Sequence, residues 1–87
     1  MRIIYECEKV VILQEKDKFL VHVLDNYRFV KEIQTNRKNL LSILKKEFSN
    51  TKFKEGYVFG KKLNTTINRS MNAEMLLKFI WMTNEEE

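Results

Sequence analysis

The chain has 87 residues, of which 44% are hydrophobic and 32% are charged, and its formal net charge is +4. This length suits one domain with a modest core, and the apolar content excludes an intrinsically disordered chain. No apolar run reaches the roughly 18–20 residues of a membrane-spanning helix, and glutamates stand where a signal peptide would be apolar. We therefore expect a cytoplasmic protein with a single domain, 1–83, and a frayed acidic tail, 84–87.

Residue usage indicates a compartment and a source. The single cysteine, Cys7, cannot form an internal disulfide, which agrees with a reducing cytoplasm. Lysine and asparagine are abundant and proline is absent. This usage is typical of AT-rich coding regions, so we expect a bacterial or phage gene and a location in the bacterial cell or phage host.

Residues 2–14 alternate between apolar side chains on two sides and are rich in β-branched residues, which predicts strand. Thirteen residues are long for one strand, so we expect either a bend or bulge near Cys7–Lys9 or two short strands. Residues 15–17 form a polar turn, after which 18–24 alternate again. Because both sides of these strands are apolar, each face of the sheet should be covered by a helix or a second chain.

A third strand is predicted at 27–33, after a tight turn at Asp25–Asn26. Its alternation places Tyr27, Phe29 and Ile33 on one face. Two glycines bracket residues 57–59, which predicts a short strand in a basic loop or hairpin.

Two helices are predicted. The first runs from about 36 to 48, with Thr35 or Asn36 as its N-cap and leucines at helical spacing. The second runs from about 71 to 82 after Ser70 and is apolar around most of its circumference. The predicted fold class is therefore α+β, with an antiparallel sheet of three to four strands and two helices.

Charge is distributed unevenly along the chain. Residues 1–35 are balanced, residues 36–69 carry nine Lys and Arg against two Glu, and residues 70–87 are acidic. Such asymmetry indicates a polyanionic partner, which is either nucleic acid or an acidic protein surface.

The segment 45–63 combines this basic charge with aromatic side chains. Lysines can follow phosphates while rings stack on bases, as in surfaces that bind single-stranded nucleic acid. Lysine predominates over arginine, which favours phosphate contact over bidentate base recognition. The alternative is that the rings belong to the core and the lysines are only solvated. The predicted nucleic-acid-binding residues are Lys45, Lys46, Lys52, Lys54, Tyr57, Phe59, Lys61 and Lys62.

The second predicted helix suggests a different class of function. Its apolar circumference exceeds the stripe that packing on one small core requires, and methionine suits adaptable contact surfaces. The predicted protein interface consists of Met71, Met75, Trp81 and Met82. It would serve a homodimer, or a phage-type inhibitor or adaptor that blocks a host or defence protein such as a nucleic-acid-processing enzyme. Exposure of Tyr57 and Phe59 would favour nucleic acid, and their burial beside an exposed methionine patch would favour this alternative.

Nothing in the sequence predicts catalysis. Cys7 and His22 are the only classical nucleophile and base, and both lie in apolar strands. One His and one Cys match no structural zinc spacing, and two glycines cannot form a nucleotide-binding fingerprint. We expect a non-enzymatic binding protein without catalytic residues, metal or cofactor.

Overall fold

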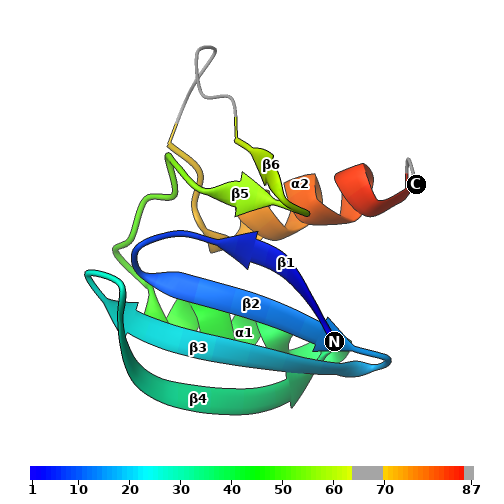
Figure 1. The fold of residues 1–87 in the computed structure, drawn as a ribbon, viewed down its shortest axis with the longest axis horizontal. Coiled ribbons are helices and arrows are strands. Elements are labelled where there is room, and N and C mark those ends of the chain that lie inside the picture. The colour runs from blue at the N-terminus through cyan, green and yellow to red at the C-terminus, as the bar shows by residue number, and fades with distance from the viewer. Residues whose placement is uncertain (64–69, 86–87) are drawn as a thin grey trace.

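The computed structural model describes residues 1–63 and 70–85, with side chains to residue 83. It is a compact α+β domain in which two helices pack behind one antiparallel sheet (Figure 1). The predicted class is confirmed, but the sheet has six strands in the order β4-β3-β2-β1-β5-β6, so the expectation of three to four strands was wrong. The strands are β1 (Arg2–Glu6), β2 (Val10–Glu15), β3 (Lys18–Asp25), β4 (Arg28–Asn36), β5 (Tyr57–Val58) and β6 (Lys61–Lys62).

The additional strands come from two hairpins. Residues 2–14 form two short strands, the second of the two alternatives predicted for this stretch. The chain turns at Cys7–Lys9, where the Cys7 amide donates to the Val10 carbonyl over 2.9 Å, and β1 and β2 pair with each other. The short strand predicted near 57–60 is likewise a hairpin, in which Val58 pairs with Lys61 across a turn formed by Phe59 and Gly60. Both turns are tight enough to reverse the chain without proline.

The turn between β3 and β4 lies one residue later than expected. Asp25 pairs with Arg28, and the two turn residues, Asn26 and Tyr27, have φ of 51° and 72°. Positive φ at both central positions is the pattern of a type I′ turn, which matches the twist of the strands it joins. Tyr27 is therefore a turn residue and not part of the strand.

An irregularity in β4 also changes which faces its side chains occupy. The register shifts between Val23 and Leu24, so that Phe29 lies across from Leu24 while Ile33 lies across from Val21. An extra residue reverses the alternation of a strand. Phe29 and Ile33 consequently lie on opposite faces, whereas the sequence pattern placed them on one.

Helix α1 (Arg37–Glu47) begins as predicted: the Asn36 side chain accepts a hydrogen bond from the Asn39 amide over 2.9 Å. Helix α2 (Ala73–Glu85) begins later than predicted, because Asn72 rather than Ser70 provides the cap, accepting from the Met75 amide over 2.9 Å. It also continues to Glu85. The tail residues 86–87 lie outside the described residues, and a frayed tail stays a prediction.

Both helices lie on the same face of the sheet (Figure 1). The core there includes Ile12, Phe19 and Val21 from the strands, with Leu44 of α1 and Ile80 of α2. On the opposite face Ile3, Leu13 and Leu20 align across β1, β2 and β3, and no helix in the described part of the chain covers them. Helices therefore cover one face, as predicted, and cover of the other face by a second chain stays a prediction.

Gly56 generates a test of the fold. A Cβ at this position would lie 2.5 Å from the Glu6 carbonyl oxygen, and its φ is +136°. Gly60 has φ of +79° but open space around it, so it supplies a matched control. We expect Gly60→Ala to cost about 1–2 kcal/mol through backbone strain alone and Gly56→Ala to cost clearly more, measured by urea unfolding. Equal losses would contradict a close approach of β1 and residue 56.

Candidate nucleic-acid interface

A groove of about 1150 Å³ lies where the β1–β2 turn, the β5–β6 hairpin and the loop after α1 meet. We call it the basic groove. Its charged and tyrosine lining residues are Glu6, Glu8, Lys9, Tyr27, Lys52, Lys54, Glu55, Tyr57 and Lys62. The fold therefore brings together lining residues that are up to 64 positions apart in the sequence, from Glu6 to Ser70.

The groove unites four of the eight predicted nucleic-acid-binding residues: Lys52, Lys54, Tyr57 and Lys62. The three lysines are exposed, and Tyr57 retains 45% of its surface accessible. Tyr57 and Lys62 are cross-strand partners in the β5–β6 hairpin, so their side chains leave the same face of the hairpin. Their role in binding nucleic acid stays a prediction.

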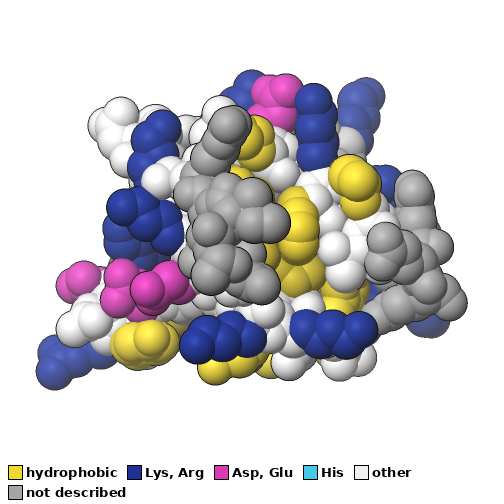
Figure 2. Space-filling view, turned by 90° about the horizontal axis from the view of Figure 1, so that it is seen from above, with side chains coloured by type: hydrophobic (Ala, Val, Ile, Leu, Met, Phe, Trp, Pro, Cys, Tyr) yellow, Lys and Arg dark blue, Asp and Glu magenta, His cyan; other side chains and the backbone are white. Residues whose placement is uncertain are grey.

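The other four predicted residues do not line the groove. Lys45 lies in the last turn of α1 and forms an ion pair with Glu74 at 3.5 Å, and Lys46 is exposed on the same turn. Lys61 is exposed, and Phe59 is half-buried with the Arg2 guanidinium 4.8 Å from its ring centroid. Figure 2 shows Lys and Arg side chains at several separate places around the edge of one face, rather than in one continuous patch.

The remaining aromatic side chains of the basic segment belong to the core. Phe48 and Phe53 are buried and meet edge to face with their centroids 6.0 Å apart, an arrangement that favours aromatic packing. Phe53 makes a similar contact with Tyr5. For these two phenylalanines, the alternative that the rings are structural is correct.

Sequence reasoning missed two lining residues of the groove, Lys9 and Tyr27. Lys9 belongs to the balanced N-terminal segment and so gave no charge signal. Tyr27 follows Asn26 in a hairpin turn where glycine would be the usual second residue. The unusual tyrosine at this position is the signal that could have marked it as a functional residue.

The buried Tyr5 fixes the position of Glu55 and Gly56, which line one side of the groove. Its hydroxyl donates to the Glu55 carbonyl over 2.7 Å, and its ring approaches the position that a Cβ on Gly56 would take. Burial raises the pKa of the Tyr5 phenol above its ordinary value, and the neighbouring Cys7 raises it further. The phenol therefore remains a neutral hydrogen-bond donor at physiological pH and fixes the approach to β5.

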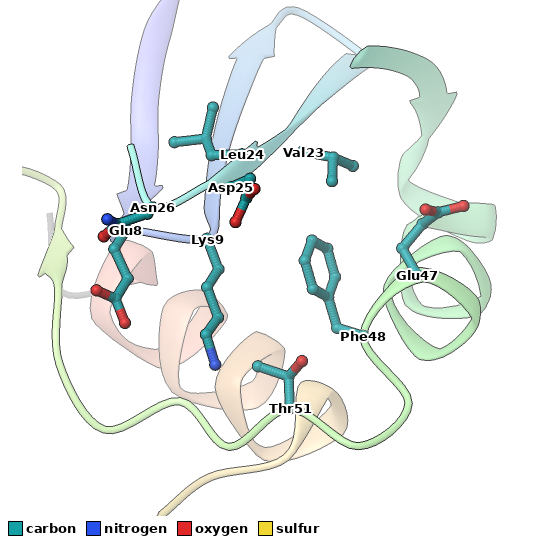
Figure 3. A pocket seen from close by; sticks show the side chains of 9 residues that line it. All are labelled: Glu8, Lys9, Val23, Leu24, Asp25, Asn26, Glu47, Phe48 and Thr51. Atoms are coloured by element: carbon teal, nitrogen blue, oxygen red, sulfur yellow. The ribbon is translucent and has the colours of Figure 1, made fainter. Parts of the chain in front are cut away.

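A smaller cavity of about 400 Å³ lies between the ends of β2 and β3 and the end of α1 (Figure 3). Its lining includes the carboxylates of Glu8, Asp25 and Glu47, and Lys9, which also lines the basic groove. Glu47 is paired with Lys31 at 3.0 Å. An excess of carboxylates disfavours phosphate here, which leaves the basic groove as the better anion site.

Cys7 and His22 have separate structural partners. The Cys7 sulfur accepts from the Lys9 amide at 3.5 Å, while His22 Nε2 lies 2.8 Å from Glu32 Oε2 and its ring meets Phe29 edge to face. Neither hydrogen bond joins the two. In the described part of the chain no group of three or more His, Cys, Asp and Glu side chains could hold a metal ion. The expectation of a protein without catalysis or metal stays a prediction.

The predicted protein interface is only partly on the surface. Met75 and Met82 of α2 are 43% and 66% exposed, and Phe79 between them is 40% exposed. Trp81 instead packs edge to face on Phe19 and lies under the Arg37 guanidinium, and Met71 is a half-buried bridge partner of Phe53. We call Met75, Phe79 and Met82 the α2 stripe; their spacing places them on one side of the helix.

Comparisons with known proteins add no family. No protein-family model, curated protein or solved structure matches the chain.

Neither helix in the described residues is long and apolar enough to cross a membrane.

Proposed function

We propose that this protein is a non-enzymatic nucleic-acid-binding protein and that the basic groove is its binding site. The observation that carries the proposal is the convergence of Lys9, Lys52, Lys54 and Lys62 on one groove with an exposed tyrosine. Ammonium groups supply contacts to phosphate, and the ring supplies a surface for an unpaired base.

The groove favours binding without sequence specificity. Lysine contacts phosphate as a point charge and reads no base edge in the bidentate manner of arginine. Glu6, Glu8 and Glu55 share the groove with the four lysines, so its electrostatic attraction is moderate. The proposal is therefore a salt-sensitive interaction that treats different sequences alike.

The salt dependence of binding tests this proposal. Four lysine–phosphate contacts to a single strand predict a slope of about −3 for log K against log salt. Replacing Lys52 and Lys62 by Gln should reduce the slope by roughly 1–2 and weaken binding to all sequences alike. Fluorescence anisotropy with labelled oligonucleotides at about 50–200 mM salt measures both quantities.

A matched control removes the same charge elsewhere. Lys16 and Lys38 are exposed, and neither lines the groove, so the double change to Gln there should leave the slope and affinity nearly unchanged. Equal effects of the two double variants would indicate attraction by net charge alone, and absence of binding to DNA and RNA would contradict the proposal.

A second candidate function rests on the α2 stripe. Three large apolar side chains exposed together on one helix favour a protein partner, as expected for a homodimer or for an inhibitor or adaptor of a host or defence protein. An acidic partner surface would also complement the exposed lysines.

The homodimer is tested by sedimentation. We expect the wild-type chain to dimerise at micromolar concentration, and Phe79→Ser with Met82→Ser to make it monomeric while leaving nucleic-acid binding intact. A wild-type monomer would exclude the dimer and leave a different protein as the partner of the stripe.

A further inference from the structure

Tyr27 occupies a backbone conformation that disfavours its side chain. It is the second turn residue between β3 and β4, and its φ is +72°. This region favours glycine, and asparagine tolerates it. Asn26 precedes it with φ of 51°, so a residue suited to the turn is followed by one that is not. An aromatic side chain held here needs a physical reason.

Packing within the protein does not supply that reason. Phe59, the other aromatic residue with positive φ, is half-buried beneath the Arg2 guanidinium and contacts the core, so burial offsets its backbone strain. Tyr27 remains 74% exposed, the largest exposed fraction of any large hydrophobic side chain in the described part of the protein. The strained backbone thus presents a ring to the surroundings.

The position of Tyr27 connects that ring to the basic groove. Its amide donates to the Glu8 carbonyl over 2.9 Å, which ties the β3–β4 turn to the β1–β2 turn. Tyr57 lies beside the β1–β2 turn as well, because it pairs with Glu6, the last residue of β1 before that turn. Both tyrosines line the groove together with Lys9. The two exposed rings therefore flank one short segment of backbone that also carries an ammonium group.

We propose that Tyr27 and Tyr57 are paired base-stacking residues and that the ligand of the basic groove is single-stranded nucleic acid. This inference rests on the function proposed above and specifies its ligand. A phenol ring can stack only on a base that is not already stacked in a duplex. The tight turn fixes the backbone of Tyr27, so less conformational freedom is lost when the ring engages a base.

Replacing Tyr27 by Gly separates binding from folding. Gly suits the turn, so the melting temperature should rise by roughly 4–8 °C, while affinity for a labelled oligothymidine should fall by about five- to a hundredfold. Affinity for a duplex of the same length should change by less than about twofold, because duplex binding would use the lysines alone. Loss of folding therefore cannot explain the loss of affinity.

Two further variants serve as controls. Tyr27→Phe keeps the ring and should retain single-strand affinity within about threefold. Lys16 has φ of 58° in the β2–β3 turn at the opposite end of β3, so Lys16→Gly relieves similar strain away from the groove. It should raise stability and leave single-strand affinity within about twofold of the wild type.

The outcomes distinguish this inference from the proposed function. Two results would overturn the inference and leave the proposed function standing. One is lysine-dependent binding whose affinity does not change in Tyr27→Gly, and the other is an affinity for duplex equal to that for single strand. A wild-type chain that binds neither single strand nor duplex would overturn both, and the groove would then be assigned to a protein partner.

Discussion

The contact between Tyr5 and the segment Glu55–Gly56 determines where the groove lies. The Tyr5 hydroxyl donates to the Glu55 carbonyl across 50 positions of sequence, and Gly56 approaches β1 more closely than any residue with a Cβ could. These two constraints place β5 beside β1, where Tyr5 pairs with Val58 and Glu6 with Tyr57. The backbone hydrogen bond from the Phe59 amide to the Ile4 carbonyl, 3.1 Å long, and the burial of Val58 also hold the β5–β6 hairpin against the sheet.

This arrangement explains why the basic segment does not act as one surface. The chain between α1 and α2 contributes Phe53, Val58 and Leu63 to the core. Of the exposed lysines in this stretch, Lys52, Lys54 and Lys62 line the groove and Lys61 does not. Some reach the groove, while others remain on the last turn of α1 or on β6. Basic residues are concentrated in residues 36–69 of the sequence. In the folded protein they lie at several places on the surface, so only some of them can contact one ligand.

Helix α1 and the fold class were predictable because their signals are local. Asn36 caps the helix that the leucine spacing predicts, and alternation identifies β2 and β3. The groove could be predicted only in part, since its basic wall comes from contiguous sequence but Lys9 and Tyr27 reach it through pairing of distant strands. Nor could local pattern predict that Trp81 packs on Phe19. The strand count was too low because the sequence pattern did not decide between a bulge and two strands at Cys7–Lys9, and because the second strand of the β5–β6 hairpin is only the two polar residues Lys61–Lys62, which carry no alternation of apolar residues.

The structure presents the basic groove, the α2 stripe and a sheet face that no described helix covers. Nuclear magnetic resonance can show which of these surfaces an oligonucleotide contacts. Titrating a short single-stranded oligonucleotide into the isotope-labelled protein should shift the backbone amide signals of Lys9, Tyr27 and Tyr57 most strongly. The same titration should leave Leu13, Leu20 and Gln34, which lie in register across the uncovered face, nearly unmoved. Shifts concentrated on those three residues, with the groove unchanged, would contradict the assignment of the basic groove as the binding site.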